Sequence, residues 1–422
     1  MMRRFFYWLL RLVLLATLIL VVWAGWYVYR KGFTKKWKQF VSTEFRKRGV
    51  EISFSRLTLD PVHGLVARDV VIVDTKDHAK QLAVINRIAL DINFNNFLRG
   101  KPFLKGLDLR DARLSLPLDP SDRSSPTIVL SHLNARLLLP QSNQIFLSQA
   151  EAQMYGFHVT ASGQLINPAA YHPSPRAGGG GGSVENPGKK GQWLTELTSQ
   201  LNALRFEGES PRVEIQFSGD LEKPDKIFIQ ATLWAEKVRR NRYRLENLYA
   251  VLDYRDRIFA LKQLVASDSL GRMDAIGTLR LPTGEAEFSL KSTLDLQGAA
   301  SMVQASNPLD ECVFYQPPTV ELSANGNVRE ILKSKVSGKI ALQKFAIRSV
   351  LFESLAANFS WDNGQWYVDD FKLDQRSGGM TATAMQAQDG FHCKLQSQIN
   401  PRDLMPLFSG KVAETLSALE FE

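Results

Sequence analysis

Cysteine and histidine are scarce in this chain of 422 residues, which holds two cysteines and six histidines. Cys312 and Cys393 have neither a CxxC partner nor a nearby histidine. The histidines are scattered without the spacing of metal ligands: His63, His78, His132, His158, His172 and His392. We therefore expect no metal site, no redox site and no cofactor. Whether the two cysteines form a disulfide stays open.

Recognisable catalytic motifs are also absent. The chain contains no P-loop, no GxSxG elbow and no HExxH helix. Asp369 and Asp370 form the most noticeable carboxylate pair. Adjacent residues of a strand point to opposite faces, so we expect this pair to mark a strand end rather than to act together. The sequence predicts a protein that is not an enzyme.

A basic surplus is lacking from most of the chain, although the net charge is +9. Residues 1–48 hold 11 Lys and Arg residues against one acidic residue, which leaves 41 basic and 42 acidic residues from Gly49 onward. The electrostatic footprint of a nucleic-acid-binding body is therefore missing. We expect no nucleic acid among the partners.

One long hydrophobic run is present, between Arg11 and Arg30, where 18 residues carry no charge. With the apolar residues before Arg11 it is long enough to cross a bilayer. The run ends in Trp and Tyr rather than in the small residues of a cleaved signal, so it predicts a retained anchor. Residues 1–30 are thus expected to be a short tip and a transmembrane helix. The flanking charges alone would place the body in the cytosol, although long domains also translocate against them.

The segment 31–49 is basic and amphipathic. Phe33, Phe45 and other apolar residues share one helical face, with lysines and arginines over the other. This pattern suits a helix on an anionic membrane surface, and equally a helix that covers one end of the body. The residues predicted to contact the membrane surface are Lys35, Lys36, Trp37, Lys38 and Phe40.

Beyond Gly49 the chain alternates apolar and polar residues with a period of two, which is typical of strands. The alternation runs through RVEIQF at 212–217, KVSGKIALQ at 335–343 and FHCKLQSQI at 391–399. One sheet face is thus apolar and the other polar, as in antiparallel sheets. The residues predicted to line an apolar groove are Val213, Ile215, Phe217, Ile340, Leu342 and Leu395.

The body is also repetitive. Pro211, Gly219, Leu248, Gly271 and Met273 recur further along the chain, all at the same offset, as Pro318, Gly326, Leu355, Gly378 and Met380. A further copy is indicated upstream, where Leu133 begins a similar pattern. Repeated units that each expose one apolar face should pair edge to edge into one elongated sheet. We expect about 20–25 strands, which would extend for roughly 100–120 Å. Two or three ordinary β domains in a row are the alternative.

These patterns divide the chain into an N-terminal β region at 50–166, a flexible loop rich in Pro and Gly at 167–191, and two β repeat units at 192–307 and 308–422. The segment 192–206 has the pattern of a helix that covers part of the apolar face. A similar segment at 411–422 resembles the start of a further unit. We therefore predict that more chain, or a partner protein, completes the sheet at this C-terminal edge.

The combined pattern resembles the AsmA-like family, which includes the TamB and YhdP types. The similar parts are the opening anchor, the segments VEISFSRLTLDPVHGLVARDVVI (50–72) and NFLRGKPFLKGLDLRDARLSL (96–116), and the stretch from Ser337 to Phe408. The resemblance implies an anchor in the bacterial inner membrane and a body in the periplasm. It also implies a long curved β-sheet groove that shields lipid acyl chains.

The resemblance therefore implies binding or transfer of phospholipid in outer-membrane biogenesis. A membrane-tethered scaffold or regulator of outer-membrane protein assembly is the alternative. The apolar sheet face distinguishes the two, because a groove leaves that face open whereas a scaffold seals it. Lipid identity, the direction of transfer and the energy source are not encoded in any motif of the sequence.

Overall fold

The structure is a computed structural model. It describes residues 51–60, 64–73, 81–93, 104–117, 127–141, 143–167, 199, 201, 203–303, 309–387 and 390–408. The predicted anchor at 1–30, the basic segment with Lys35, Lys36, Trp37, Lys38 and Phe40, most of the loop at 167–191 and the segment at 411–422 lie outside these residues. Within them, no helix is both long and apolar enough to cross a membrane.

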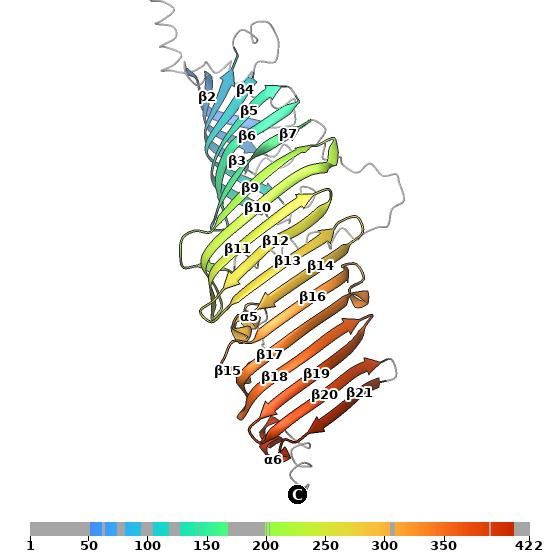
Figure 1. The fold of residues 1–422 in the computed structure, drawn as a ribbon. Coiled ribbons are helices and arrows are strands. Elements are labelled where there is room, and N and C mark those ends of the chain that lie inside the picture. Colours follow the sequence, from blue (N-terminus) through green and yellow to red (C-terminus); the bar gives the residue numbers. More distant parts are fainter. Residues whose placement is uncertain are drawn as a thin grey trace, which may run out of the picture. The chain divides into compact units, whose positions relative to one another are not determined.

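The protein is mainly β, with 76% of the described residues in strands. The described residues form 21 strands in an open, curved sheet, which confirms the mainly β part of the predicted fold class and the predicted number of strands. The chain forms two compact units, which are described one at a time (Figure 1). Unit 1 contains residues 1–199 and 216–224, and unit 2 contains residues 200–215 and 225–422.

Unit 1 is an antiparallel meander in which each strand pairs with the next along the chain. Its strands are β1 (Glu51–Asp60), β2 (Gly64–Val73), β3 (Gln81–Ile92), β4 (Leu104–Pro117), β5 (Thr127–Gln141), β6 (Gln144–Met154) and β7 (Phe157–Ile166). One face carries a continuous hydrophobic cluster with Val70, Ile85 and Ala112 at its centre. The meander therefore buries one apolar face across successive strands.

Unit 2 continues the same antiparallel pattern. Its main strands are β10 (Lys223–Arg240), β11 (Tyr243–Arg255), β12 (Ile258–Ser267), β13 (Arg272–Arg280), β14 (Glu285–Ser292), β16 (Thr319–Asn327), β17 (Lys335–Ile347), β18 (Val350–Asp362), β19 (Gln365–Gln375), β20 (Gly378–Ala387) and β21 (Gly390–Ser397). Two short strands, β8 (Arg205–Phe206) and β15 (Cys312–Phe314), pair with β10 and β17. β9 (Arg212–Asp220) is divided, with its first half in unit 2 and its second half in unit 1.

The repeat is confirmed by the strand boundaries. β9 and β11 span 212–220 and 243–255, and their counterparts β16 and β18 span 319–327 and 350–362, displaced by the same offset as the repeated residues. β14 of the first copy pairs with β16 of the second, from Glu285 opposite Asn327 to Ser292 opposite Val320. The two copies therefore share one hydrogen-bonded ladder, and the alternative of separate β domains is wrong for them.

Regular alternation is broken at β-bulges, which the sequence interpretation missed. Asp369 and Asp370 lie in the middle of β19 and not at a strand end, so that prediction is wrong. Asp370 has a φ of +52°, and the register shifts between Val368 and Phe371. Because both of these apolar residues face the same side, both aspartates lie toward the other side. The Asp370 carboxylate accepts a hydrogen bond from Asn358 at 3.1 Å.

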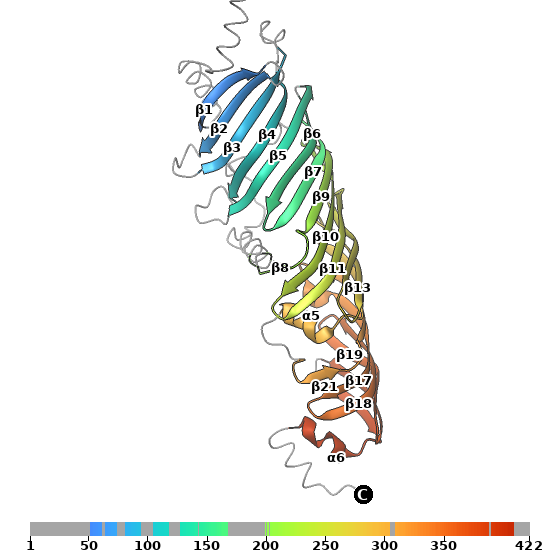
Figure 2. The same ribbon diagram turned by 90° about the vertical axis from the view of Figure 1, so that its left-hand side faces the viewer.

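Each copy closes one end of its apolar face with a short helical segment. In the first copy, α5 (Leu296–Val303) packs against a buried cluster that contains Val238, Leu245 and Leu294. In the second, α6 (Pro401–Leu404) and η3 (Met405–Leu407) pack against the corresponding cluster around Phe345 and Phe352. Figure 2 shows α5 and α6 on the same side of this sheet. The predicted helix at 192–206 ends earlier than expected, because Arg205 and Phe206 form β8.

The cluster of the first copy is held by a buried polar contact. The Tyr243 hydroxyl donates to Asp268 at 2.7 Å, and Asp268 also accepts from the backbone N–H groups of Leu270, Gly271 and Asp295. Burial would raise the pKa of Asp268, but these hydrogen bonds outweigh it, so the pKa lies below its usual value. Burial and the Asp268 carboxylate raise the pKa of Tyr243. Asp268 thus ties the start of β11 to the loop that leads into α5.

Replacing Tyr243 with Phe is expected to lower the free energy of unfolding by about 1–2 kcal/mol at neutral pH. The lowered pKa of Asp268 means that its contribution is present above about pH 4 and is lost as the pH falls through the folded-state pKa. The difference in the free energy of unfolding between wild type and Tyr243→Phe should therefore be smaller in acid. Denaturant titrations at about pH 7 and about pH 2.5 measure it. The exposed Tyr315→Phe is the control, and a difference that does not depend on pH would contradict this role of Asp268.

Candidate functional site

An uninterrupted row of non-polar residues crosses eleven strands of unit 2. Directly paired residues define it from β10 to β21, and we call it the apolar row. Its members are Leu233, Ala250, Leu264, Ala275, Leu290, Leu322, Gly338, Phe359, Val368, Ala384 and Cys393. Neighbouring strands lie about 4.8 Å apart, so the row forms one continuous hydrocarbon surface.

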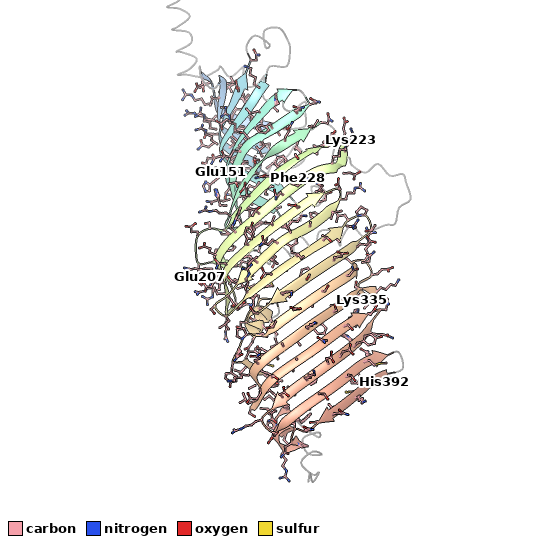
Figure 3. The ribbon with its side chains drawn as sticks, viewed as in Figure 1. Glu151, Glu207, Lys223, Phe228, Lys335 and His392 are labelled. Carbon is pink, nitrogen blue, oxygen red and sulfur yellow. The ribbon has the colours of Figure 1, made fainter. Side chains whose placement is uncertain are left out.

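From β13 to β17 the opposite face carries a row of charged residues. Each residue of this row is adjacent in sequence to a member of the apolar row. Asp274 pairs with Lys291, Lys291 with Glu321, and Glu321 with Lys339, and we call these four residues the charge row. Lys291 and Glu321 form an ion pair at 3.0 Å. Elsewhere on unit 2 the Arg255 guanidinium lies 4.8 Å from the ring centre of Phe228, which Figure 3 labels. In the charge row, negative and positive side chains alternate from one strand to the next, as they do in favourable cross-strand pairs.

The apolar face is covered at one end of the strands and open along the rest. At the covered end, Phe345 and Phe352 are 1% exposed and their rings stack with centres 5.1 Å apart. Away from it, Leu252 is 43% exposed, Phe259 46% and Trp366 46%. Among the described residues no helix or second sheet covers this open part. The face is therefore open over most of its width and covered only at this end.

Aromatic pairs stand at the open end of both copies. Tyr254 of β11 and Phe259 of β12 have ring centres 4.8 Å apart, and Trp361 of β18 and Trp366 of β19 have centres 4.9 Å apart. The second pair is the counterpart of the first in the next copy of the repeat. Each pair flanks a hairpin turn and presents broad apolar surface at the margin of the face. Aromatic side chains at the boundary between apolar and wet regions are typical of lipid-contacting surfaces.

Phenylalanine rings cover glycines across the strands. The ring of Phe359 lies over Gly338, where an added Cβ atom would come within 2.3 Å of the ring. Phe217 covers Gly163 in the same way within unit 1. Glycine at these positions lets a large ring lie flat against the sheet, which smooths the apolar surface.

The six residues predicted to line the groove do not all lie on the open part of the apolar face. Val213, Ile215 and Ile340 are half-buried, and so is Phe217 in the part of β9 that belongs to unit 1. Leu395 on β21 is 55% exposed. Leu342 is 8% exposed and belongs to the covered cluster of the second copy, so a charge introduced there would enter a core and not an open face.

Residues that the sequence interpretation did not single out make up most of the open face. Leu252, Phe259, Leu322, Phe359 and Trp366 all belong to it by register. The available signal was the alternation within each strand, extended from one copy to the other by the constant offset of the repeat. The alternation within a strand does not reveal the register between strands, because β-bulges shift that register.

Several titratable residues of the described chain are engaged individually rather than in one cluster. The described residues contain no group of three or more His, Cys, Asp or Glu side chains that could hold a metal ion. Cys312 and Cys393 are free thiols, and burial raises the pKa of Cys312. Glu207, also labelled in Figure 3, is engaged by Arg239 at 2.8 Å. What the arrangement offers chemically is an extended hydrocarbon surface bounded by aromatic rings.

No family model, no curated protein and no solved structure matches this chain. The resemblance to the AsmA-like family accordingly rests on the quoted sequence segments and stays a prediction.

Proposed function

We propose that the protein binds acyl chains of membrane lipids, phospholipids above all, along the open part of the apolar face of unit 2. The observation that supports this most directly is the apolar row, which crosses eleven strands while large residues beside it are more than 40% exposed. Soluble proteins rarely expose a contiguous apolar surface of this kind without a partner for it. An acyl chain on the row gains about 0.8 kcal/mol for each buried methylene.

The resemblance of the quoted sequence segments to the AsmA-like family extends this proposal to lipid transfer in outer-membrane biogenesis and envelope maintenance. In that setting the chain is a single-pass protein of the bacterial inner membrane with its body in the periplasm. Alkaline phosphatase fused after residue 422 should then be active in cells. If only a cytosol-active reporter works at the same position, the periplasmic assignment fails.

The proposed binding is tested by purifying the full chain in mild detergent, extracting it with organic solvent and analysing the extract by mass spectrometry. We expect phospholipid in an amount comparable to the protein, above that in a membrane protein of similar anchor purified in parallel. An extract with no more lipid than this control would contradict the proposal. That result would favour a membrane-tethered scaffold or regulator of outer-membrane protein assembly.

A further inference from the structure

Four arginines stand directly opposite one another on the first four strands of unit 1. Arg56 of β1 pairs with Arg68 of β2, Arg68 with Arg87 of β3, and Arg87 with Arg110 of β4. We call these four residues the arginine row. Side chains opposite one another in a sheet have Cβ atoms about 4.5–5.5 Å apart, so four positive charges are gathered along one line.

Arg68 and Arg110 lie on the face opposite the hydrophobic cluster of unit 1. Ala67 and Val70, which flank Arg68 and Asp69, both belong to the cluster side, and Asp69 between them has a positive φ. Leu109 and Ala112 flank Arg110 in the same way, with a bulge at Asp111. In both strands two residues stand between neighbouring cluster residues, which turns Arg68 and Arg110 away from the apolar face.

Like charges directly opposite one another are destabilising in a sheet. The charge row of unit 2 shows the usual solution, because Asp274, Lys291, Glu321 and Lys339 alternate in sign. The arginine row does not alternate at any of its three steps. A structural role alone therefore gives no reason for this arrangement.

Two carboxylates lie close to arginines of the row. Asp60 lies 4.0 Å from Arg87, and Asp108 lies 3.3 Å from Arg110, two residues away on the same strand. Asp69 accepts a hydrogen bond from Ser55 at 2.5 Å. Asp111 is engaged by His132 at 3.1 Å.

Two arginines retain unused donors. Nε of Arg87 is buried and has no hydrogen-bond partner among the described residues, although 27% of its side chain is exposed. Arg68 is exposed, and no ion pair joins it to any carboxylate in the part of the chain that the structure describes. A buried unsatisfied N–H group costs about 1–3 kcal/mol and is commonly explained by an ion or water.

We propose that the arginine row is a binding site for a phosphate-class oxyanion, held by Arg68 and Arg87 with Arg56 and Arg110 beside them. Guanidinium groups are planar forks that bind phosphate oxygens in pairs, and the partially buried position of Arg87 strengthens such bonds. The phosphate is either a free ion or the headgroup of an anionic phospholipid. This site is on unit 1, whereas the proposed acyl-chain surface is on unit 2, so neither proposal depends on the other.

The test uses the full chain in a non-ionic detergent, with thermal unfolding followed in sodium phosphate and in sodium chloride of equal ionic strength. Wild type should be more stable in phosphate. Arg68→Gln and Arg87→Gln should each bind phosphate about tenfold more weakly, because each removes a charge-assisted pair of hydrogen bonds. Arg280→Gln, an exposed arginine 3.9 Å from Glu285 in unit 2, is the matched control and should respond as wild type does.

The melting temperature in chloride separates a binding site from a structural ion network. Arg68→Gln removes one of four like charges that stand opposite one another. Its melting temperature in chloride should therefore equal or exceed that of wild type. Equal phosphate responses of wild type and Arg68→Gln, or a chloride melting temperature that falls while the phosphate response persists, would overturn the proposal. A larger response to dihexanoyl phosphatidylglycerol below its micelle concentration than to inorganic phosphate identifies the lipid headgroup, and an equal response identifies the free ion.

Discussion

Replacing Phe345 with Ala is expected to lower the free energy of unfolding by about 3–5 kcal/mol. Phe345 is 1% exposed, stacks on Phe352 and is surrounded by residues of β17, β18 and the C-terminal helical segment. The substitution leaves a cavity that the paired strands cannot close without giving up their register. Urea titration of the detergent-solubilised chain measures the loss.

The matched control is Trp366→Ala, which removes a larger ring from the open part of the same face. Trp366 is 46% exposed and packs mainly on Trp361. Because an exposed aromatic pair contributes about 0.5–1.5 kcal/mol, we expect a loss near 1 kcal/mol. Equal losses of unfolding free energy for the two variants would mean that the apolar face is sealed along its whole length and is not open at Trp366.

Replacing Leu322 with Asp is expected to remove most of the bound lipid while leaving the protein folded. Leu322 lies in the middle of the apolar row, between Leu290 and Gly338, and is only half-buried. A carboxylate there keeps contact with water in the empty protein, but it would have to lose that water beneath an acyl chain. We expect roughly tenfold less co-purified phospholipid per protein and a melting temperature within about 4 °C of wild type.

Ser323→Asp is the control for this substitution, because it places the same charge one residue away on the opposite face. Ser323 is exposed, and the residues directly paired with it, Ser289 and Ser337, are uncharged. It should retain lipid at the level of wild type. Equal lipid loss in both variants would mean that lipid does not bind on the apolar face. Failure of Leu322→Asp to fold would instead indicate a sealed core.

The strands and their repetition could be predicted from the sequence because both follow from local patterns. Val213, Ile215 and their alternating neighbours define a strand without reference to any other part of the chain. The offset between Pro211 and Pro318 likewise needs only comparison of the chain with itself, and both prolines are fully buried in the structure. Sequential pairing then follows for repeats that expose one apolar face.

The division of the apolar face into covered and open parts could not be predicted in the same way. Leu342 and Leu322 have similar surroundings in the sequence, yet one is in a core and the other on the open row. The difference arises from α6, which follows β21 and packs back onto β17. Such a contact joins segments that are far apart in the sequence, and period-two alternation carries no information about it.

The bulges were missed for a related reason, although the sequence does carry a signal. Val368 and Phe371 are apolar residues three positions apart inside a strand, as are Leu342 and Phe345. Period two cannot place both members of such a pair on one face, so an extra residue must be inserted. The outward position of Arg110 is in part a consequence, because the register between β4 and β5 of unit 1 shifts between Leu109 and Ala112.

The central claim, that lipid acyl chains lie on the open apolar face, is tested most directly by photocrosslinking in living cells. The photoreactive residue p-benzoylphenylalanine replaces Phe359 of the apolar row in one variant, and Tyr367 on the opposite face in another. After irradiation, intact-protein mass spectrometry should find phospholipid adducts at position 359 and not at position 367. Adducts at both positions in equal amount, or no lipid adduct at position 359, would contradict the account.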